Sequence, residues 1–186
     1  MDISRGLVSK KRISWGLSWL VIALSGAGCH DDPRYCRGGH CGCGDQPVCN
    51  VNCGDVVGCT IDCASAEECN GRCDHDCTMS CNDMTSCTAD CLDNCFVDCS
   101  RTGTCDTICD ESCEVLCSNT SDCTAEVGPG SHVSCLSVGG CNVLCHGSCS
   151  LECPQGGCNL TCETGGPVSC ASSAYTVCGG ASCDPI

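Results

Sequence analysis

The chain has 186 residues, 31 of them cysteine, and a formal net charge of −15 at pH 7. Aromatic residues make up only 3% of it, so it lacks the bulky side chains from which a chain of this length normally builds an apolar core. So much cysteine is typical of a disulfide scaffold formed in an oxidising compartment. The negative charge argues against partners such as nucleic acid or an anionic membrane surface.

Residues 1–28 have the layout of a signal peptide, with a basic first part and an apolar stretch from Ile13 to Gly28. The run from Leu24 to Cys29 resembles the lipobox of bacterial lipoproteins, although Gly26 stands where that family prefers an aliphatic residue. The resemblance implies a lipid on Cys29 and attachment to a membrane, most simply the outer membrane. The alternative is cleavage after Ala27 and a soluble secreted protein.

Residues 29–48 are interpreted as a tether between the lipid and the rest of the chain. They contain a glycine-rich cluster with Cys36, Cys41 and Cys43, none of which fits the repeat that follows. His40, Cys41 and Cys43 form a weak candidate metal site, because thiolate and imidazole suit zinc and copper(I). The leader and the regular cysteine spacing favour oxidised cysteines instead, so we expect no resident metal or other cofactor.

Residues 49–170 form the repeat, whose cysteines recur at steps of 4, 4, 4 and 6 residues from Cys69 to Cys117. The period is therefore 18 residues, a sign of a repeat architecture. Each unit contains two segments of the form Cys-x-x-x-Cys, in which both cysteines and the middle residue share one face of a strand. The connectors between the segments are rich in turn formers. This pattern predicts an all-β, flattened, two-sided solenoid filled with disulfides.

The pairing is predicted from a coil that folds back on itself, so that its first cysteine faces its fourth and its second faces its third. One coil supports this scheme, because it has Val127 and Ser131 in place of the second and third cysteines and keeps the outer two. The inner pairs are then Cys53–Cys59, Cys73–Cys77, Cys91–Cys95, Cys109–Cys113 and Cys145–Cys149. The outer pairs are Cys49–Cys63, Cys69–Cys81, Cys87–Cys99, Cys105–Cys117, Cys123–Cys135, Cys141–Cys153 and Cys158–Cys170.

Two other folds with an 18-residue period fit less well: the cysteines do not step by six as in a hexapeptide β-helix, and the connectors hold too many helix breakers for an α-helix. The architecture resembles the disulfide-bridged β-solenoids of insect antifreeze proteins, whose coil is shorter. Ice binding is not expected, because the outward positions of the second segments hold no array of identical residues. Residues 171–186 are interpreted as a C-terminal cap, and the partners of Cys36, Cys41, Cys43, Cys162, Cys178 and Cys183 stay open.

No nucleophile stands beside a fixed base in a recognisable motif, so we expect no enzyme. Stacking of the coils would bring Asp93 beside Glu111, with Asp110, Asp74 and Asp76 close by, which makes calcium a weak possibility. The sequence favours a structural or interaction protein of the cell envelope, a rigid acidic rod held by its lipid. The alternative is a metallothionein-like protein that sequesters metal with thiolates.

Overall fold

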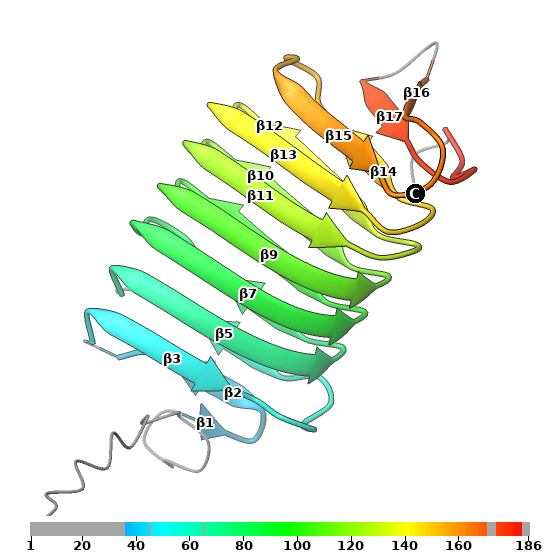
Figure 1. Ribbon diagram of the computed structural model, residues 1–186. Coiled ribbons are helices and arrows are strands. Elements are labelled where there is room, and N and C mark those ends of the chain that lie inside the picture. The colour runs from blue at the N-terminus through cyan, green and yellow to red at the C-terminus, as the bar shows by residue number, and fades with distance from the viewer. Residues whose placement is uncertain (1–35, 45, 65, 171–173, 184–186) are drawn as a thin grey trace, which may run out of the picture.

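The computed structural model describes residues 36–44, 46–64, 66–170 and 174–183, and within them it confirms the predicted disulfide-rich β-solenoid (Figure 1). Each coil contributes one strand to each of two sheets. The ten-stranded sheet, called sheet A, has the spatial order β1 (Cys36–Arg37), β2 (His40–Gly42), β4 (Thr60–Asp62), β6 (Thr78–Ser80), β8 (Phe96–Ser100), β10 (Glu114–Ser118), β12 (His132–Leu136), β14 (Ser150–Glu152), β17 (Tyr175–Val177) and β16 (Val168–Ser169).

The seven-stranded sheet, called sheet B, follows the same axis. Its order from the C-terminal end is β15 (Cys158–Cys162), β13 (Gly140–Cys145), β11 (Asp122–Val127), β9 (Thr104–Glu111), β7 (Ser86–Asp93), β5 (Glu68–His75) and β3 (Val48–Asn52). All pairs within sheet B are parallel and in register at the 18-residue period, as in Cys69↔Cys87↔Cys105. Equivalent residues of successive coils therefore stack in straight ladders.

The solenoid begins earlier along the chain than predicted. Strand β2 pairs in parallel with β4, so residues 40–42 belong to sheet A and not to a tether that ends at residue 48. At the other end β17 pairs antiparallel with β14 and with β16, which closes sheet A with a small cap. The expected signal peptide and Cys29 lie outside the described residues.

The interior is one side chain thick and consists of three ladders. Two are columns of cysteine, and the third, between them, is a stripe of small and aliphatic residues. From sheet A the stripe receives Ile61, Met79, Val97, Val115, Val133 and Leu151, and from sheet B Val51, Gly71, Ala89, Thr107, Ala125, Val143 and Leu160. A Cβ on Gly71 would lie 2.0 Å from Met79 Cε, so the smallest residue faces the most flexible one, as predicted.

Each coil has two bends, and each bend repeats one backbone feature. Gly58, Asp76, Asn94, Ser112 and Gly130, at intervals of 18 residues, all have positive φ. The other bend repeats it at Asp83, Arg101, Asn119 and Ser137. Glycine, asparagine and aspartate tolerate this left-handed conformation best, which explains why the connectors are rich in these residues.

The structure pairs the cysteines around these bends. The inner bridges agree with the prediction: Cys53–Cys59, Cys73–Cys77, Cys91–Cys95, Cys109–Cys113 and Cys145–Cys149. The outer predictions Cys49–Cys63, Cys69–Cys81, Cys87–Cys99, Cys105–Cys117, Cys123–Cys135, Cys141–Cys153 and Cys158–Cys170 differ from the structure. It has instead the bridges Cys43–Cys49, Cys63–Cys69, Cys81–Cys87, Cys99–Cys105, Cys117–Cys123, Cys135–Cys141 and Cys153–Cys158.

The cause of the difference is the rise of the solenoid. A coil does not close on itself, because the chain leaves sheet A at Cys81 and climbs to the next strand of sheet B at Cys87, 6.0 Å away between Cα atoms. Every bridge therefore spans a bend, and the outer ones join one coil to the next. In the cap the structure adds Cys162–Cys178 and Cys170–Cys183.

The coil with Val127 and Ser131 offers a test of how much one inner bridge stabilises the fold. The equivalent cysteines in the neighbouring coils have Cα atoms 6.4 and 6.1 Å apart, so the double variant Val127→Cys with Ser131→Cys should form the missing bridge. In the loop-closure treatment a five-residue loop contributes about 2 kcal/mol. The variant loses the hydrogen bond from Cys113 N to Ser131 Oγ (3.1 Å), so the net gain should be smaller.

Denaturant unfolding without reductant measures this gain, and the Ser131→Ala variant serves as the control for the lost hydrogen bond. We expect a higher midpoint for the double variant and a slightly lower one for the control. Two titratable thiols in the folded double variant would contradict the expected geometry.

Candidate functional surface

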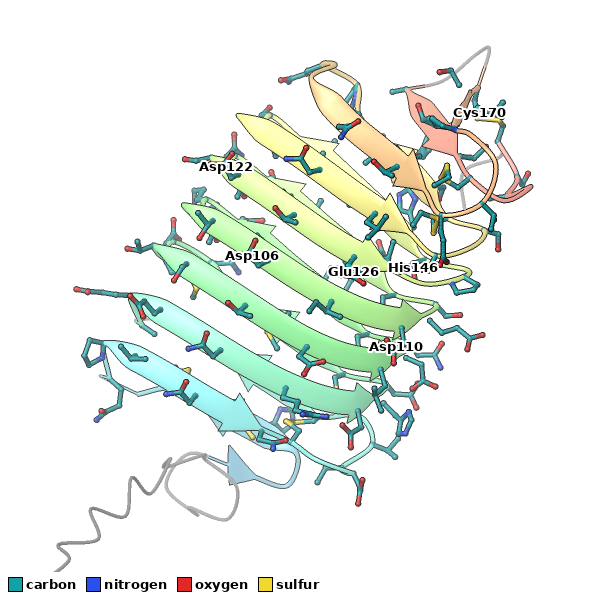
Figure 2. All side chains as sticks on the ribbon, viewed as in Figure 1. Asp106, Asp110, Asp122, Glu126, His146 and Cys170 are labelled. Carbon is teal, nitrogen blue, oxygen red and sulfur yellow. A yellow bond between two sulfur atoms is a disulfide. The ribbon has the colours of Figure 1, made fainter. Side chains whose placement is uncertain are left out.

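The outer face of sheet B carries a regular polar ladder along the axis. Because side chains alternate along each strand, the residue between the two buried cysteine-side neighbours points outward. These outward residues pair in register and are all exposed: Asn50, Asn70, Thr88, Asp106, Thr124, Asn142 and Asn159. The strands repeat about every 4.8 Å, so the ladder is a straight row of small hydrogen-bonding groups. Figure 2 shows Asp106 within this row.

The sequence reasoning missed this row. It examined the outward positions of the second segments, which lie on sheet A, and not those of the first segments. The signal was available in the 18-residue steps from Asn70 to Asn142. Asn70 Nδ2 donates to Asn50 Oδ1 at 3.0 Å, so the row is already ordered at its N-terminal end.

The next ladder on the same face is mixed and gives the surface its individual character. It runs through Asn52, Arg72, Asp90, Ile108, Glu126, Leu144 and Thr161. Ile108 is 50% exposed and Leu144 36%, and Thr124, Asn142 and Leu144 line a shallow hollow. A flat face that combines apolar side chains with hydrogen-bonding groups has the composition of a protein contact surface.

One edge of this face, at the first bend of each coil, is acidic. The register places His75 beside Asp93 and Asp93 beside Glu111, which brings together the two acids that the sequence predicted as neighbours. His75 Nδ1 is hydrogen-bonded to Asp93 Oδ1, and this bond raises the pKa of His75. A calcium ion at Asp93 would have to compete with this histidine.

A second histidine cluster lies on the same edge near the C-terminal end (Figure 2). His146 Nε2 is 2.8 Å from Glu126 Oε1, and its Nδ1 is 3.2 Å from Glu163 Oε2. The two hydrogen bonds, that to Glu126 first, raise the pKa of His146. The imidazolium therefore joins three successive strands of sheet B, since Glu126 is on β11, His146 follows β13 and Glu163 follows β15.

This cluster predicts a pH dependence of stability. A histidine whose pKa is higher in the folded state stabilises the fold fully below the unfolded pKa, and this contribution is lost as the pH rises through the folded value. Stability at the C-terminal coils should therefore fall between about pH 6.5 and the raised folded pKa of His146.

The measurement is the C2–H chemical shift of His146 against pH, together with unfolding midpoints on both sides of the transition. Glu126→Gln should lower the fitted pKa of His146, and His146→Gln should remove its share of the pH dependence. His132 is an internal control, because burial lowers its pKa instead. An unchanged His146 titration in Glu126→Gln would contradict the assignment.

On the outer face of sheet A, His132 takes part in a small polar network. Its Nδ1 lies 2.8 Å from Ser150 Oγ and its Nε2 lies 3.0 Å from Ser134 Oγ. Ser134 Oγ donates to Glu152 Oε2 at 3.0 Å. The carboxylate thus contacts the serine and not the imidazole, so this network lacks the acid–histidine contact by which a catalytic triad orients its base.

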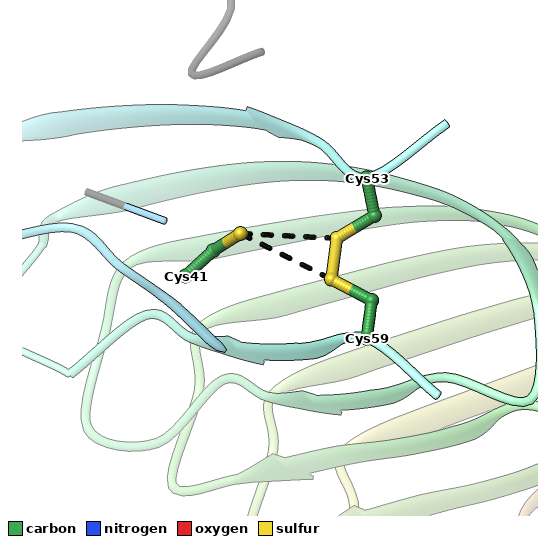
Figure 3. Close-up of side chains that lie close together, drawn as sticks. All are labelled: Cys41, Cys53 and Cys59. Atoms are coloured by element: carbon green, nitrogen blue, oxygen red, sulfur yellow. Dashed lines mark hydrogen bonds between the residues drawn. A yellow bond between two sulfur atoms is a disulfide. The ribbon is translucent and has the colours of Figure 1, made fainter. Parts of the chain in front are cut away.

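The weak metal candidates His40, Cys41 and Cys43 are not brought together as a site. Cys43 is bridged to Cys49, and His40 is exposed on the face of β2 opposite to buried Cys41. Cys41 Sγ lies 3.9 Å from Cys53 Sγ and 4.0 Å from Cys59 Sγ, so its neighbours are the sulfurs of an inner bridge (Figure 3).

Sulfur atoms of successive outer bridges also lie close together. The groups Cys43/Cys49/Cys69, Cys63/Cys69/Cys81 and Cys81/Cys87/Cys99 each have all three sulfurs within 4.8 Å of one another. Every one of these residues is bridged, and a disulfide sulfur is a poor metal ligand compared with a thiolate. The outer bridges Cys43–Cys49 to Cys153–Cys158 together form what we call the outer sulfur column.

Comparisons with known proteins add no relative: a scan of protein-family models, a search of curated proteins and a search of solved structures each returned no match. Within the described ranges there is no helix of the length and apolarity needed to cross a bilayer.

Proposed function

We propose that the chain is a structural or interaction protein of the cell envelope: a rigid acidic solenoid that is tethered through a lipid on Cys29 and acts without catalysis. The single observation that supports this most is the outer sulfur column together with the inner bridges, which fixes the backbone along the whole length of both sheets. Disulfides in such numbers are typical of an extracellular or otherwise oxidising environment.

The face of sheet B is the proposed contact surface. Its polar row and the exposed Ile108 and Leu144 supply hydrogen bonds and apolar area on a flat support. Because the bridges hold the backbone, binding would cost little conformational entropy, which is the usual advantage of a preorganised surface. The acidic edge favours a basic or neutral partner over nucleic acid.

The decisive measurement is the intact mass of the protein from its native membrane fraction, alkylated once without reduction and once after it. The proposal expects no alkylation before reduction, alkylation of the repeat cysteines after it, and a lipid-sized increment on the peptide that begins at Cys29. A soluble product cleaved after Ala27 without lipid would remove the tether from the proposal and leave the secreted form.

The same experiment separates the second candidate function, metal sequestration. The specific observation in its favour is that three cysteine sulfurs repeatedly lie within 4.8 Å of one another, which would be a soft ligand set if they were reduced. Extensive alkylation before reduction, with metal released on acidification, would replace the structural proposal with this one.

A further inference from the structure

The outer sulfur column is buried along its length and becomes accessible at one end. Its cysteines from Cys43 to Cys141 are at most 4% exposed, whereas Cys153 and Cys158 are both partly exposed. These two line a cavity of about 350 Å³ between the last coil and the cap. The terminal bridge is therefore the place where a molecule from solvent can reach the column.

The walls of this cavity indicate what it accepts. Leu151, Leu160, Pro167 and Ala174 supply apolar surface, and the Gly156–Gly157 turn contributes no side chains. The chain as a whole is strongly acidic. A small thiol that is uncharged or cationic fits this environment better than an acidic one, since like charges repel.

We propose that the Cys153–Cys158 bridge is a thiol-exchange site for small neutral or cationic thiols, and that the thiol it releases passes inward along the outer sulfur column. The proposal concerns the chemistry of the column and does not depend on the lipid tether or on the partner of sheet B.

The first step is an ordinary exchange. The external thiolate attacks Cys158 Sγ and forms a mixed disulfide, the bond between the two protein sulfurs breaks, and its electron pair leaves on Cys153 Sγ as a thiolate. One thiol is consumed and one is produced, so neither an oxidant nor a reductant is needed.

The second step depends on the stacking of the column. Cys153 stands at the same repeat position as Cys81, whose sulfur lies within 4.8 Å of both sulfurs of the preceding bridge, Cys63–Cys69. By the same repeat, Cys153 faces the bridge Cys135–Cys141. Its thiolate attacks Cys141 Sγ, and Cys135 leaves as the new thiolate, again without net oxidation or reduction.

Repetition moves the thiol one coil at a time. Each step breaks one bridge of a kind and forms another of the same kind in an equivalent environment, so the steps are close to balanced in energy. The inner bridges are outside this path, because they belong to the other column.

The experiment treats the oxidised full-length protein with a substoichiometric amount of cysteamine, stops the reaction with acid, alkylates the free thiol and maps both groups after digestion at low pH. We expect cysteamine on Cys158 and the alkyl group on Cys135 or on column cysteines nearer the N-terminus. Cysteamine on the exposed Cys183 of the cap is mapped as a separate peptide.

Two matched variants keep the result interpretable. Cys135→Ser with Cys141→Ser interrupts the column one step inward, so cysteamine should still add to Cys158 while the alkyl group stays on Cys153. Cys145→Ser with Cys149→Ser removes an inner bridge of the same coil and should leave the distribution unchanged.

Two results would overturn the proposal. One is cysteamine on the cap bridges with none on Cys158, which would show that the cavity is not the site of exchange. The other is an alkyl group that stays on Cys153 in the unmodified sequence, which would show that the thiol does not move along the column.

Discussion

Reduction of all disulfides should abolish the fold, with complete loss of the β-sheet signal in far-UV circular dichroism at a pH and temperature where the oxidised protein is stable. The interior stripe contains no aromatic side chain among the described residues, and Gly71, Ala89 and Ala125 bury little apolar area. In the loop-closure treatment each bend bridge contributes about 2 kcal/mol, and these contributions overlap in a common column.

The contribution of the column can be separated from that of the inner bridges. Cys99→Ala with Cys105→Ala removes one outer bridge, and Cys91→Ala with Cys95→Ala removes an inner one. Both should lower the unfolding midpoint without unfolding the chain, because the neighbouring bridges remain. A fully reduced protein that kept its sheet signal and its slow amide exchange would show that strand pairing and the aliphatic stripe suffice.

Gly128→Ala should be among the most destabilising single substitutions in the chain, with a loss of about 3 kcal/mol or more as expected for severe overpacking. A Cβ at this position would lie 1.5 Å from the backbone oxygen of Asp110 in the coil below. Backbone cannot move aside without displacing the ladder, since Gly128 N also donates to Cys109 O at 2.9 Å.

Gly42→Ala is the matched control, because a Cβ there meets nothing within 4 Å. Thermal or denaturant unfolding of the oxidised variants measures the difference. A midpoint for Gly128→Ala that equals that of Gly42→Ala would mean that the bend at residues 128–130 is much looser than the structure has it.

The sequence was sufficient for the architecture because the cysteine period and the strand period are both visible in it. The inner bridges could be predicted for the same reason, since the turn that each one spans is short. The facing of Gly71 and Met79 followed from the same alternation, and the structure places them in contact.

The outer bridges could not be predicted because two pairings satisfy the same evidence. A coil with Val127 and Ser131 keeps Cys123 and Cys135 bridged whether they join each other or their neighbours, Cys117 and Cys141. Only the rise from one coil to the next distinguishes the two, and spacing in the sequence does not reveal it. The histidine cluster at His146 was missed because its acids, Glu126 and Glu163, come from two other coils.

Positive φ recurs at one fixed position in each bend, and this has an evolutionary consequence. A coil can be duplicated or deleted as an 18-residue unit without disturbing its neighbours, because each unit carries its own two bends and meets the next coil through the same ladder positions. The length of the solenoid, and with it the distance from the first coil to the cap, can therefore vary by whole coils while the cross-section stays constant. A chain shortened by one internal coil, from residue 87 to 104, should still fold and keep every remaining bridge around a bend.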